Sequence, residues 1–515
     1  MLSLLKSRPV VPHWLFCLAF PAALFVACNV LNVGKLAHWF PDGDGLNVWA
    51  FTAYLVAGLS LFIVVFTLLA HRWTIKPFAI LLTIPSAAAT YFIHKYDVAI
   101  DSSMVQNTLH TDPAEVGQLL SVRMWPYVAV LVLIPAAFIA RLRIEFAPGS
   151  RYLGSSVKVA GLALGLAVAC LGLNFSAIQR AGNVSNKYIL YSLVPVDILA
   201  GSISVATSSV QEWLRARRAS APIEASVTAP GNLVVVLAIG ETSRRRNFSV
   251  YGYDRRNTTP LLSQAQGLHL LDGIARRAST INALPQILEK DHVKLTAITA
   301  RAGVPTACIV NYSLYDNCAA VGETVVGPCG HGGHCYDEDV IPPLAARLSA
   351  YSSGKSFVVL HLGGGSHGPV YRDRHPPEFL RFQPTCNDAD IANRCTLEQI
   401  YNSYDNTILY VDYVVANVLQ ALDRSGVPYV FFYLSDHGES LLENGLMFHG
   451  MPPGVPLPKE QAEIPLIVKA SVPVEIVPRA QYGQPDVFDT VLDLLSIDAR
   501  KFDKTGSFVR QSNGH

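Results

Sequence analysis

Charged residues are scarce in this chain of 515 residues, where Asp, Glu, Lys and Arg together make up 15% of the sequence. Ordinary soluble domains contain about 25% of these residues. The deficit lies almost entirely before residue 175, where too little polar sequence remains to cover the apolar runs. This scarcity argues against the buried helices of a soluble protein and predicts a membrane domain in the N-terminal third.

Five apolar runs in this region approach or reach the roughly 20 residues that cross a bilayer core. They cover residues 13–33, 48–70, 77–93, 125–140 and 157–174. The first run is too long for a cleavable signal peptide, and no small-residue cleavage site follows it. Lysine and arginine gather before the first run and in the second and fourth loops, so the positive-inside rule places the N-terminus in the cytoplasm. We expect residues 1–175 to form a transmembrane domain of five helices, with everything after it outside.

Cysteine is also sparse, with nine residues, six of which lie in the C-terminal part. The motifs "CGHGGHC" at 329–335 and "CNDADIANRC" at 386–395 predict small loops closed by disulfides. Disulfides persist in oxidising compartments, which agrees with an external location. A zinc knuckle that uses His331 and His334 is the alternative interpretation of the first motif.

Residues 176–228 are predicted to connect the two domains. An amphipathic helix along the membrane surface is followed by a linker of proline and small residues. From residue 229 onward, short β-rich runs alternate with helical stretches such as 396–422. The strand candidates are 233–239, 305–310, 356–362, 428–434 and 464–469. Their continuous apolar character is typical of a parallel sheet covered on both faces. We therefore expect residues 229–515 to form an α/β/α sandwich with catalytic groups at the carboxyl ends of its strands.

Polar side chains collect where these strands end. Glu241 follows the first strand, His367 follows the strand at 356–362, and Asp436 and His437 follow the strand at 428–434, with His449 twelve residues further on. Carboxylate and imidazole ligands suit Zn²⁺ or Mn²⁺. The pattern predicts a metal-dependent enzyme that acts on an anionic ester. Spacing alone leaves the nucleophile open among Thr242, Ser243, Ser279 and Thr280.

The three arginines at 244–246, directly behind the first of these carboxylates, admit two interpretations. They face anionic headgroups, or they form a solvated start of a helix. Helix starts usually disfavour cations, but we expect the solvated interpretation to hold.

Four long motifs resemble those of the lipid A phosphoethanolamine transferases, a family that includes the mobile colistin-resistance enzymes. They are "VVVLAIGETSRRRNFSVYGYDRRNTTPLL", "LHLGGGSHGPVYRDRHPPEFLRFQPTC", "NSYDNTILYVDYVV" and "LSDHGESLLENGLMFHGMP". The resemblance spans nearly the whole chain. It implies five N-terminal transmembrane helices followed by an alkaline-phosphatase-like periplasmic domain that uses zinc.

The resemblance also implies roles for individual residues. Zinc is held by Glu241, Thr280, Asp436 and His437. Thr280 is the nucleophile, because the family's threonine precedes a proline by five residues, as Thr280 precedes Pro285. The histidines of "SHGP" and "HGMP", here His367 and His449, contact the phosphoryl group or a second zinc ion. The remaining substrate contacts implied are Asn107, Thr111, Glu115 and Ser313.

The chain departs from the family's pattern around the nucleophile. Arg276 and Gln286 stand where most members have cysteines that bridge this loop. We expect packing of Ile281 and Leu284 to hold the loop instead, with Cys308 and Cys318 as an extra bridge nearby. The segment between Pro285 and "VNYS" is also shorter than usual. A lysine that the family places just after the serine equivalent to Ser313 is not evident.

The implied reaction moves phosphoethanolamine from phosphatidylethanolamine to a lipid A phosphate through a covalent intermediate on Thr280. It would lower the negative charge of the outer membrane and weaken polymyxin binding. Alternative acceptors are core heptose and a periplasmic glucan, and alternative classes are a membrane-anchored phosphodiesterase and a non-enzymatic metal-binding surface protein. No "CxPxR" sulfatase nucleophile motif is present. We expect a monomer in the bacterial inner membrane, without a nucleic-acid partner.

Overall fold

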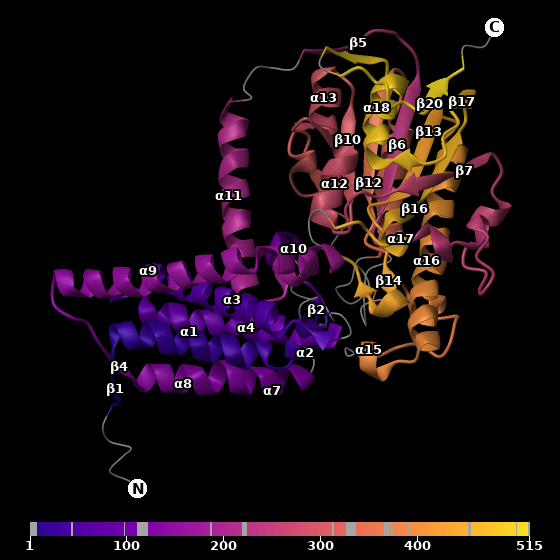
Figure 1. The fold of residues 1–515 in the computed structure, drawn as a ribbon. Helices are drawn as coiled ribbons and strands as arrows, with labels where there is room; N and C mark the ends of the chain where they lie inside the picture. Colours follow the sequence, from indigo (N-terminus) through magenta and orange to yellow (C-terminus); the bar gives the residue numbers. More distant parts are fainter. Residues whose placement is uncertain are drawn as a thin grey trace. The chain divides into compact units, whose positions relative to one another are not determined.

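The structure is a computed structural model that describes residues 8–42, 45–96, 98–110, 122–185, 188–218, 224–311, 314–325, 336–364, 371, 374–388, 391–451, 455–500 and 502–512. The chain divides into a helical unit, formed mainly by residues up to 215, and an α/β unit, formed mainly by residues from 216 onward (Figure 1). Helix α11 (Val196–Arg218) spans much of the predicted connector. The domain boundaries at 175 and 228 stay predictions.

All five predicted apolar runs are helical. Four helical segments are long and apolar enough to cross a membrane: α3 (Val48–Leu69), α4 (Ile75–Tyr96), the segment Val122–Arg141 and most of α9 (Ser150–Leu173). The first helix, α1 (His13–Asn29), has 17 residues and is shorter than these. The described residues therefore contain four candidate spans, and a count of five stays a prediction.

A short strand pairing in the helical unit joins two segments that are far apart in the sequence. Strand β1 (Val10–Pro12), before α1, pairs in parallel with β4 (Arg143–Glu145), which follows the helix α8 (Ile134–Arg141). The N-terminal segment and the fourth loop, which the positive-inside rule assigns to the same side of the membrane, thus lie side by side. The unit buries a cluster of aromatic rings, whereas α9 exposes large apolar side chains such as Leu162 and Leu173, as a lipid-facing helix does.

The α/β unit is built on an eight-stranded sheet in the order β11-β10-β12-β6-β13-β16-β7-β18. The strands are β6 (Leu233–Gly240), β7 (Leu268–Ile274), β10 (Thr306–Val310), β11 (Glu323–Val325), β12 (Lys355–His361), β13 (Tyr429–Ser435), β16 (Glu463–Ala470) and β18 (Tyr482–Gly483). The five predicted strands are all present. The prediction of a parallel sheet is wrong at one strand, because β16 runs antiparallel to both β13 and β7. Strand β7 was not predicted, because His269 and Asp272 interrupt its apolar run.

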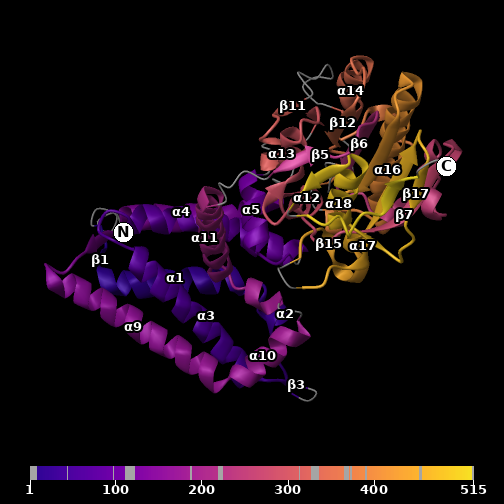
Figure 2. The same cartoon turned by 90° about the horizontal axis from the view of Figure 1, so that it is seen from above.

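Helices cover both faces of this sheet, which confirms the α/β/α sandwich. Figure 2 shows the sheet between α12 (Thr280–Leu288), α13 (Leu295–Arg301) and α18 (Gln484–Leu494) on one side and α14 (Ile341–Ser349) and α16 (Leu397–Ser425) on the other. Every residue of β6 is buried. Alternate residues of this strand, such as Leu237, join the core cluster that contains α12 and α18, and the residues between them fill the opposite face.

Among the described residues of the α/β unit, two disulfides are present. Cys308 of β10 is bonded to Cys318 of the short helix η7 (Tyr315–Cys318), and Cys386 is bonded to Cys395, as the sequence predicts. Cys329, Cys335 and the alternative zinc-knuckle histidines His331 and His334 lie outside the described residues.

Helix α12 is held by its apolar face. Leu284, Ile287 and Leu288 are fully buried in the same core cluster as the Cys308–Cys318 bridge. The expected packing of Leu284 is therefore confirmed. The expected packing of Ile281 is wrong, because it is only half-buried and lies outside that cluster. Helical spacing alone would place position 281 on the same face as positions 284 and 288. Ile281 is the second residue of the helix, however, and its place in the first turn accounts for its partial exposure.

Candidate active site

The register of two neighbouring strands brings the first candidate ligands together. β6 and β13 are parallel, and Ile239 pairs with Leu434 and Gly240 with Ser435. The next residue of each strand, Glu241 and Asp436, therefore leaves the sheet at the same edge. The backbone N–H of Asp436 donates to the carbonyl oxygen of Gly240 at 2.9 Å, which continues the pairing by one step.

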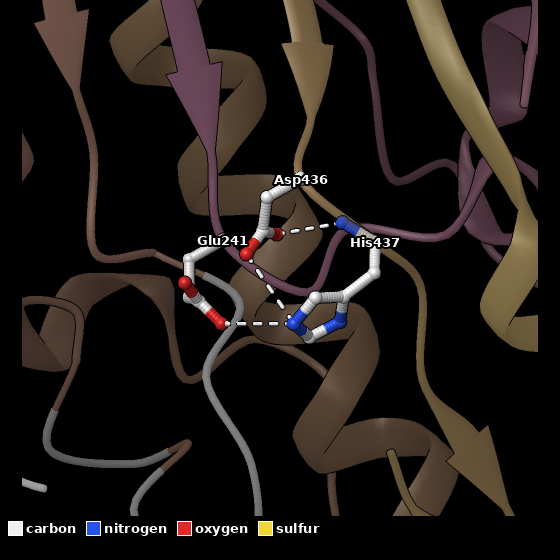
Figure 3. A group of neighbouring side chains, drawn as sticks. All are labelled: Glu241, Asp436 and His437. Atoms are coloured by element: carbon white, nitrogen blue, oxygen red, sulfur yellow. Dashed lines mark hydrogen bonds and ion pairs between the residues drawn. The ribbon is translucent and has the colours of Figure 1, made fainter. Parts of the chain in front are cut away.

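Three side chains converge at this edge (Figure 3). Potential ligand atoms of Glu241, Asp436 and His437 all lie within 4.8 Å of one another. His437 Nε2 is 3.3 Å from Asp436 Oδ2 and 3.7 Å from Glu241 Oε1. The relative exposure of these residues is 5% for Glu241 and 0% for the other two. The three residues thus form a cluster that is buried from solvent, in which two carboxylates face one imidazole.

The protonation state of His437 and the unsatisfied polar atoms of this cluster fit the binding of a divalent metal ion. Burial lowers the pKa of His437 to about 4, so its imidazole is neutral at physiological pH. His437 Nδ1 lies 3.0 Å from the carbonyl oxygen of Gly438, which can only accept, so Nδ1 carries the proton and the lone pair of Nε2 faces the carboxylates. Asp436 Oδ2 and His437 Nε2 are buried without a hydrogen-bond partner among the described residues. Such atoms are costly unless a ligand satisfies them, and Asp, Glu and His are ordinary ligands of zinc.

The nucleophile candidate at the start of α12 joins the cluster. Thr280 is the first residue of that helix, and its hydroxyl donates to Glu241 Oε2 at 2.9 Å. Thr280 is partly exposed, whereas the alternatives Thr242, Ser243 and Ser279 are buried. The amino end of a helix also stabilises negative charge close to it. The geometry therefore favours Thr280 among the four hydroxyls that spacing left open.

His449 reaches the same site from a hairpin. It follows β15 (Met447–Phe448), which pairs with β14 (Ser440–Leu441). Its ring centroid is 4.3 Å from that of His437, and its Nδ1 is 3.3 Å from Glu439 Oε2. The structure thus brings the second predicted histidine next to the candidate metal ligands.

Of the other predicted site residues, the structure describes one. Asn107 is half-buried on α5 (Ser102–His110) in the helical unit. Thr111, Glu115, Ser313 and His367 lie outside the described residues. The roles implied for these five residues stay predictions.

The arginines behind Glu241 form ion pairs within the fold, so the expectation of a solvated helix start is wrong for the first of them. Arg244 is fully buried, lies 2.7 Å from Glu443, and stacks on the rings of Tyr401 and Tyr404 at 5.3 and 5.4 Å. Arg245 pairs with Asp272 and Glu463, and Arg246 lies 3.6 Å from Glu460. Sequence reasoning missed these pairs because Arg244 and Glu443 are far apart in the chain.

The fold and the site define a class of protein. Residues 233–497, just over half of the chain, match the family model described as Sulfatase, so the α/β unit belongs to the sulfatase family. Residues 59–210 match the family model described as Phosphoethanolamine transferase EptA/EptB.

Whole-chain relatives narrow this class. The chain is 28% identical to Phosphoethanolamine transferase EptA of Escherichia coli (strain K12), over 98% of this chain and 97% of the relative. It is 30% identical to Phosphoethanolamine transferase EptA of Helicobacter pylori (strain ATCC 700392 / 26695), over 78% and 76% of the two chains. The solved integral membrane lipooligosaccharide phosphoethanolamine transferase A of Neisseria meningitidis superposes with a TM-score of 0.80 at 25% identity, over 97% and 98%. The chain belongs to the phosphoethanolamine transferase family.

Proposed function

We propose that this chain transfers phosphoethanolamine from phosphatidylethanolamine to a phosphate of lipid A, at the periplasmic face of the bacterial inner membrane. One observation carries the proposal: the partly exposed Thr280 hydroxyl lies 2.9 Å from Glu241, within a buried cluster of metal-ligand type. Membership of the phosphoethanolamine transferase family and the likeness to a lipooligosaccharide-modifying enzyme support the choice of substrates. We propose a cytoplasmic N-terminus and a monomer.

The proposed cofactor is zinc, held by Glu241, Asp436, His437 and the Thr280 oxygen. A bound zinc ion would act as a Lewis acid and lower the pKa of the threonine hydroxyl. The carboxylates and the neutral imidazole are the chain's own contribution: they are buried and already oriented toward a common point. A second zinc ion at His367 and His449 is the alternative to a direct phosphoryl contact by these histidines.

The proposed reaction has two displacements. Thr280 Oγ1 gives up its proton, for which His449 is the candidate acceptor, and attacks the phosphorus of phosphatidylethanolamine. Its bond to phosphorus forms, and the phosphorus–oxygen bond to diacylglycerol breaks. Diacylglycerol leaves as an alcohol after it takes a proton, for which His449 is the candidate donor. An oxygen of a lipid A phosphate then attacks the phosphoethanolamine ester on Thr280 and releases the threonine. Dividing one displacement into two in this way is the general strategy of covalent catalysis.

Mass spectrometry of lipid A from a polymyxin-sensitive host tests this proposal. Expression of the wild-type chain should add a phosphoethanolamine unit to lipid A and raise polymyxin tolerance, and Thr280→Ala should do neither. Ser279→Ala is the matched control, because it removes the neighbouring buried hydroxyl, which accepts a bond from Asn282, and should retain transfer.

The same experiment separates the alternatives. Phosphoethanolamine on core sugars with lipid A unmodified would contradict the proposed acceptor. Free phosphoethanolamine with no modified lipid would indicate a phosphodiesterase instead. Intact-protein mass of the wild type with donor lipid should show a phosphoethanolamine adduct on Thr280, and a lack of any adduct would contradict the two-step route.

A further inference from the structure

The residue directly after Glu241 has a strained backbone. Thr242 has a φ of 49°, in the left-handed region that β-branched residues avoid. Such a conformation persists only where the surrounding structure over-determines it, and it is found preferentially at functional sites. Thr242 therefore requires contacts that hold its two peptide groups in place.

A single buried hydroxyl supplies two of these contacts. Tyr404 Oη donates to the carbonyl oxygen of Thr242 at 2.6 Å and accepts from the backbone N–H of Arg244 at 2.9 Å. On its other side, the N–H of Thr242 donates to Asp436 Oδ1 at 3.0 Å. The turn that carries Glu241 is thus fastened to Asp436 at one end and to Tyr404 at the other.

The phenol that makes these bonds is itself fixed. Tyr404 is fully buried on α16, its ring meets the ring of Tyr371 edge-on at 5.6 Å, and the guanidinium of Arg244 stacks on it at 5.4 Å. Burial raises the pKa of Tyr404, so its hydroxyl keeps the proton that it donates. The ring cannot move without disturbing the packing on both sides.

We propose that Tyr404 is a positioning residue for the metal site: its hydroxyl holds the strained Thr242 turn and so directs the Glu241 carboxylate toward Asp436, His437 and Thr280. This inference rests on the proposed metal site and not on the lipid acceptor. Tyr404 belongs to the "NSYDN" motif, to which the proposed reaction assigns no role.

The substitution Tyr404→Phe isolates the hydroxyl. It keeps the ring and its packing but leaves the carbonyl of Thr242 and the N–H of Arg244 without their buried partner. Thr242 can then relax from its left-handed conformation and take Glu241 away from the cluster. Loss of such an outer-sphere partner typically weakens metal binding by about 10–100-fold.

Zinc affinity of the full-length chain in detergent, measured by competition with a chelator, is the primary readout. Tyr404→Phe should weaken zinc binding by about 10–100-fold and lower the kcat of transfer at subsaturating zinc, while the KM for the donor lipid changes little. The control is Tyr429→Phe, which removes another buried tyrosine hydroxyl. Its bond is to Asp423, and Tyr429 begins β13, at the opposite end of the strand from Asp436, so zinc affinity should not change.

A rescue experiment distinguishes positioning from a general loss of stability. Thr242→Gly in the Tyr404→Phe background should recover at least about tenfold of the lost zinc affinity, because glycine adopts a φ of 49° without strain. Thr242→Ala in the same background is the matched variant. It also removes the threonine side chain but keeps the Cβ, so the strain remains and no recovery is expected.

Each outcome decides between the possibilities. Wild-type zinc affinity in Tyr404→Phe would overturn the inference. Equal recovery by glycine and alanine, or recovery of the melting temperature by glycine without recovery of zinc affinity, would show a structural role only and would also overturn it. If the wild-type chain itself binds no zinc, the proposed metal site fails and this inference fails with it.

Discussion

The proposed catalytic site has two halves that are built differently. Glu241, Asp436 and His437 are buried at strand ends, and the register of β6 with β13 sets their positions. Thr280 is partly exposed at the first turn of α12, and its position depends on how that helix packs. The difference teaches that the groups that would hold a metal are buried and fixed by the sheet, whereas the hydroxyl proposed to attack a lipid phosphate is accessible.

The two halves are also stabilised by different means. Hydrogen bonds fix the half at the strand ends, which comprises Glu241, Asp436 and His437. The backbone of Thr242, for example, is hydrogen-bonded to both Asp436 and Tyr404. The helix half depends on apolar packing of α12 against a core that includes the Cys308–Cys318 bridge. The sequence pattern of the family implies a disulfide between the positions of Arg276 and Gln286. In this chain, apolar packing of α12 takes the place of that bridge.

The largest effect is expected from removing a charge in the strand-end half. Asp436→Asn keeps an oxygen that can accept from the N–H groups of Thr242 and His437 but loses the negative charge. Transfer should fall by about a thousandfold or more, beyond the 10–100-fold cost of losing an outer-sphere partner, with little change in melting temperature. Asp423→Asn should leave transfer unchanged, because Asp423 lies on α16 and accepts a hydrogen bond from Tyr429, at the opposite end of β13 from Asp436. Normal zinc content and transfer in Asp436→Asn would contradict the assignment of this half.

A cavity in the helix half should lower stability instead. Leu284→Ala should reduce the free energy of unfolding by about 3 kcal/mol, because Leu284 is fully buried in the core cluster. Thermal unfolding of the detergent-solubilised chain measures this change, and zinc affinity at low temperature should be retained. Ile281→Ala, at the half-buried position of the same helix, should cost less than about 1 kcal/mol. Equal losses at the two positions would contradict the packing described for α12.

The disulfide behind α12 should matter slightly less than the core leucine. Replacing both Cys308 and Cys318 by alanine opens a bridge with a sequence separation of 10 and should cost about 2–3 kcal/mol. Activity should then be lost at a lower temperature, since the bridge packs in the core that holds α12. The paired control replaces Cys386 and Cys395, whose separation is 9. If this control lowers the temperature of activity loss as much, the bridge behind α12 has no special connection with the nucleophile.

The smallest effect is expected at the ion pair of Arg244. Burial raises the pKa of Glu443, but the Arg244 guanidinium and several hydrogen bonds outweigh it, so the pKa lies below its ordinary value of 4.5. A depressed pKa means that the stabilisation is present above pH 4.5 and is lost as the pH falls through the folded-state pKa. Glu443→Gln should therefore cost about 2 kcal/mol at pH 7, and the cost should shrink below pH 4.5. Melting curves at both pH values measure it, and a difference that grows in acid would contradict the pair.

Local patterns predicted most of the elements. The apolar runs agree with the helices α1, α3, α4 and α9, and the β-rich runs agree with strands such as β6 and β13. Hydrophobic length and periodicity are properties of short stretches, so a single sequence reveals them. The direction of β16 and the existence of β7 were not predicted, because strand direction depends on the connection between strands and β7 has a mixed pattern.

By itself, the sequence determined that the chain has a membrane region and an α/β region, and that Glu241, Asp436 and His437 follow strand ends, because each of these facts follows from a few neighbouring residues. Only the tertiary structure decided that Thr280 faces Glu241, that Arg244 is buried against Glu443, and that Tyr404 holds the turn after Glu241. The physical reason is separation along the chain: these pairs are 39, 199 and 162 residues apart, and only the folding of strands and helices onto one another brings them into contact.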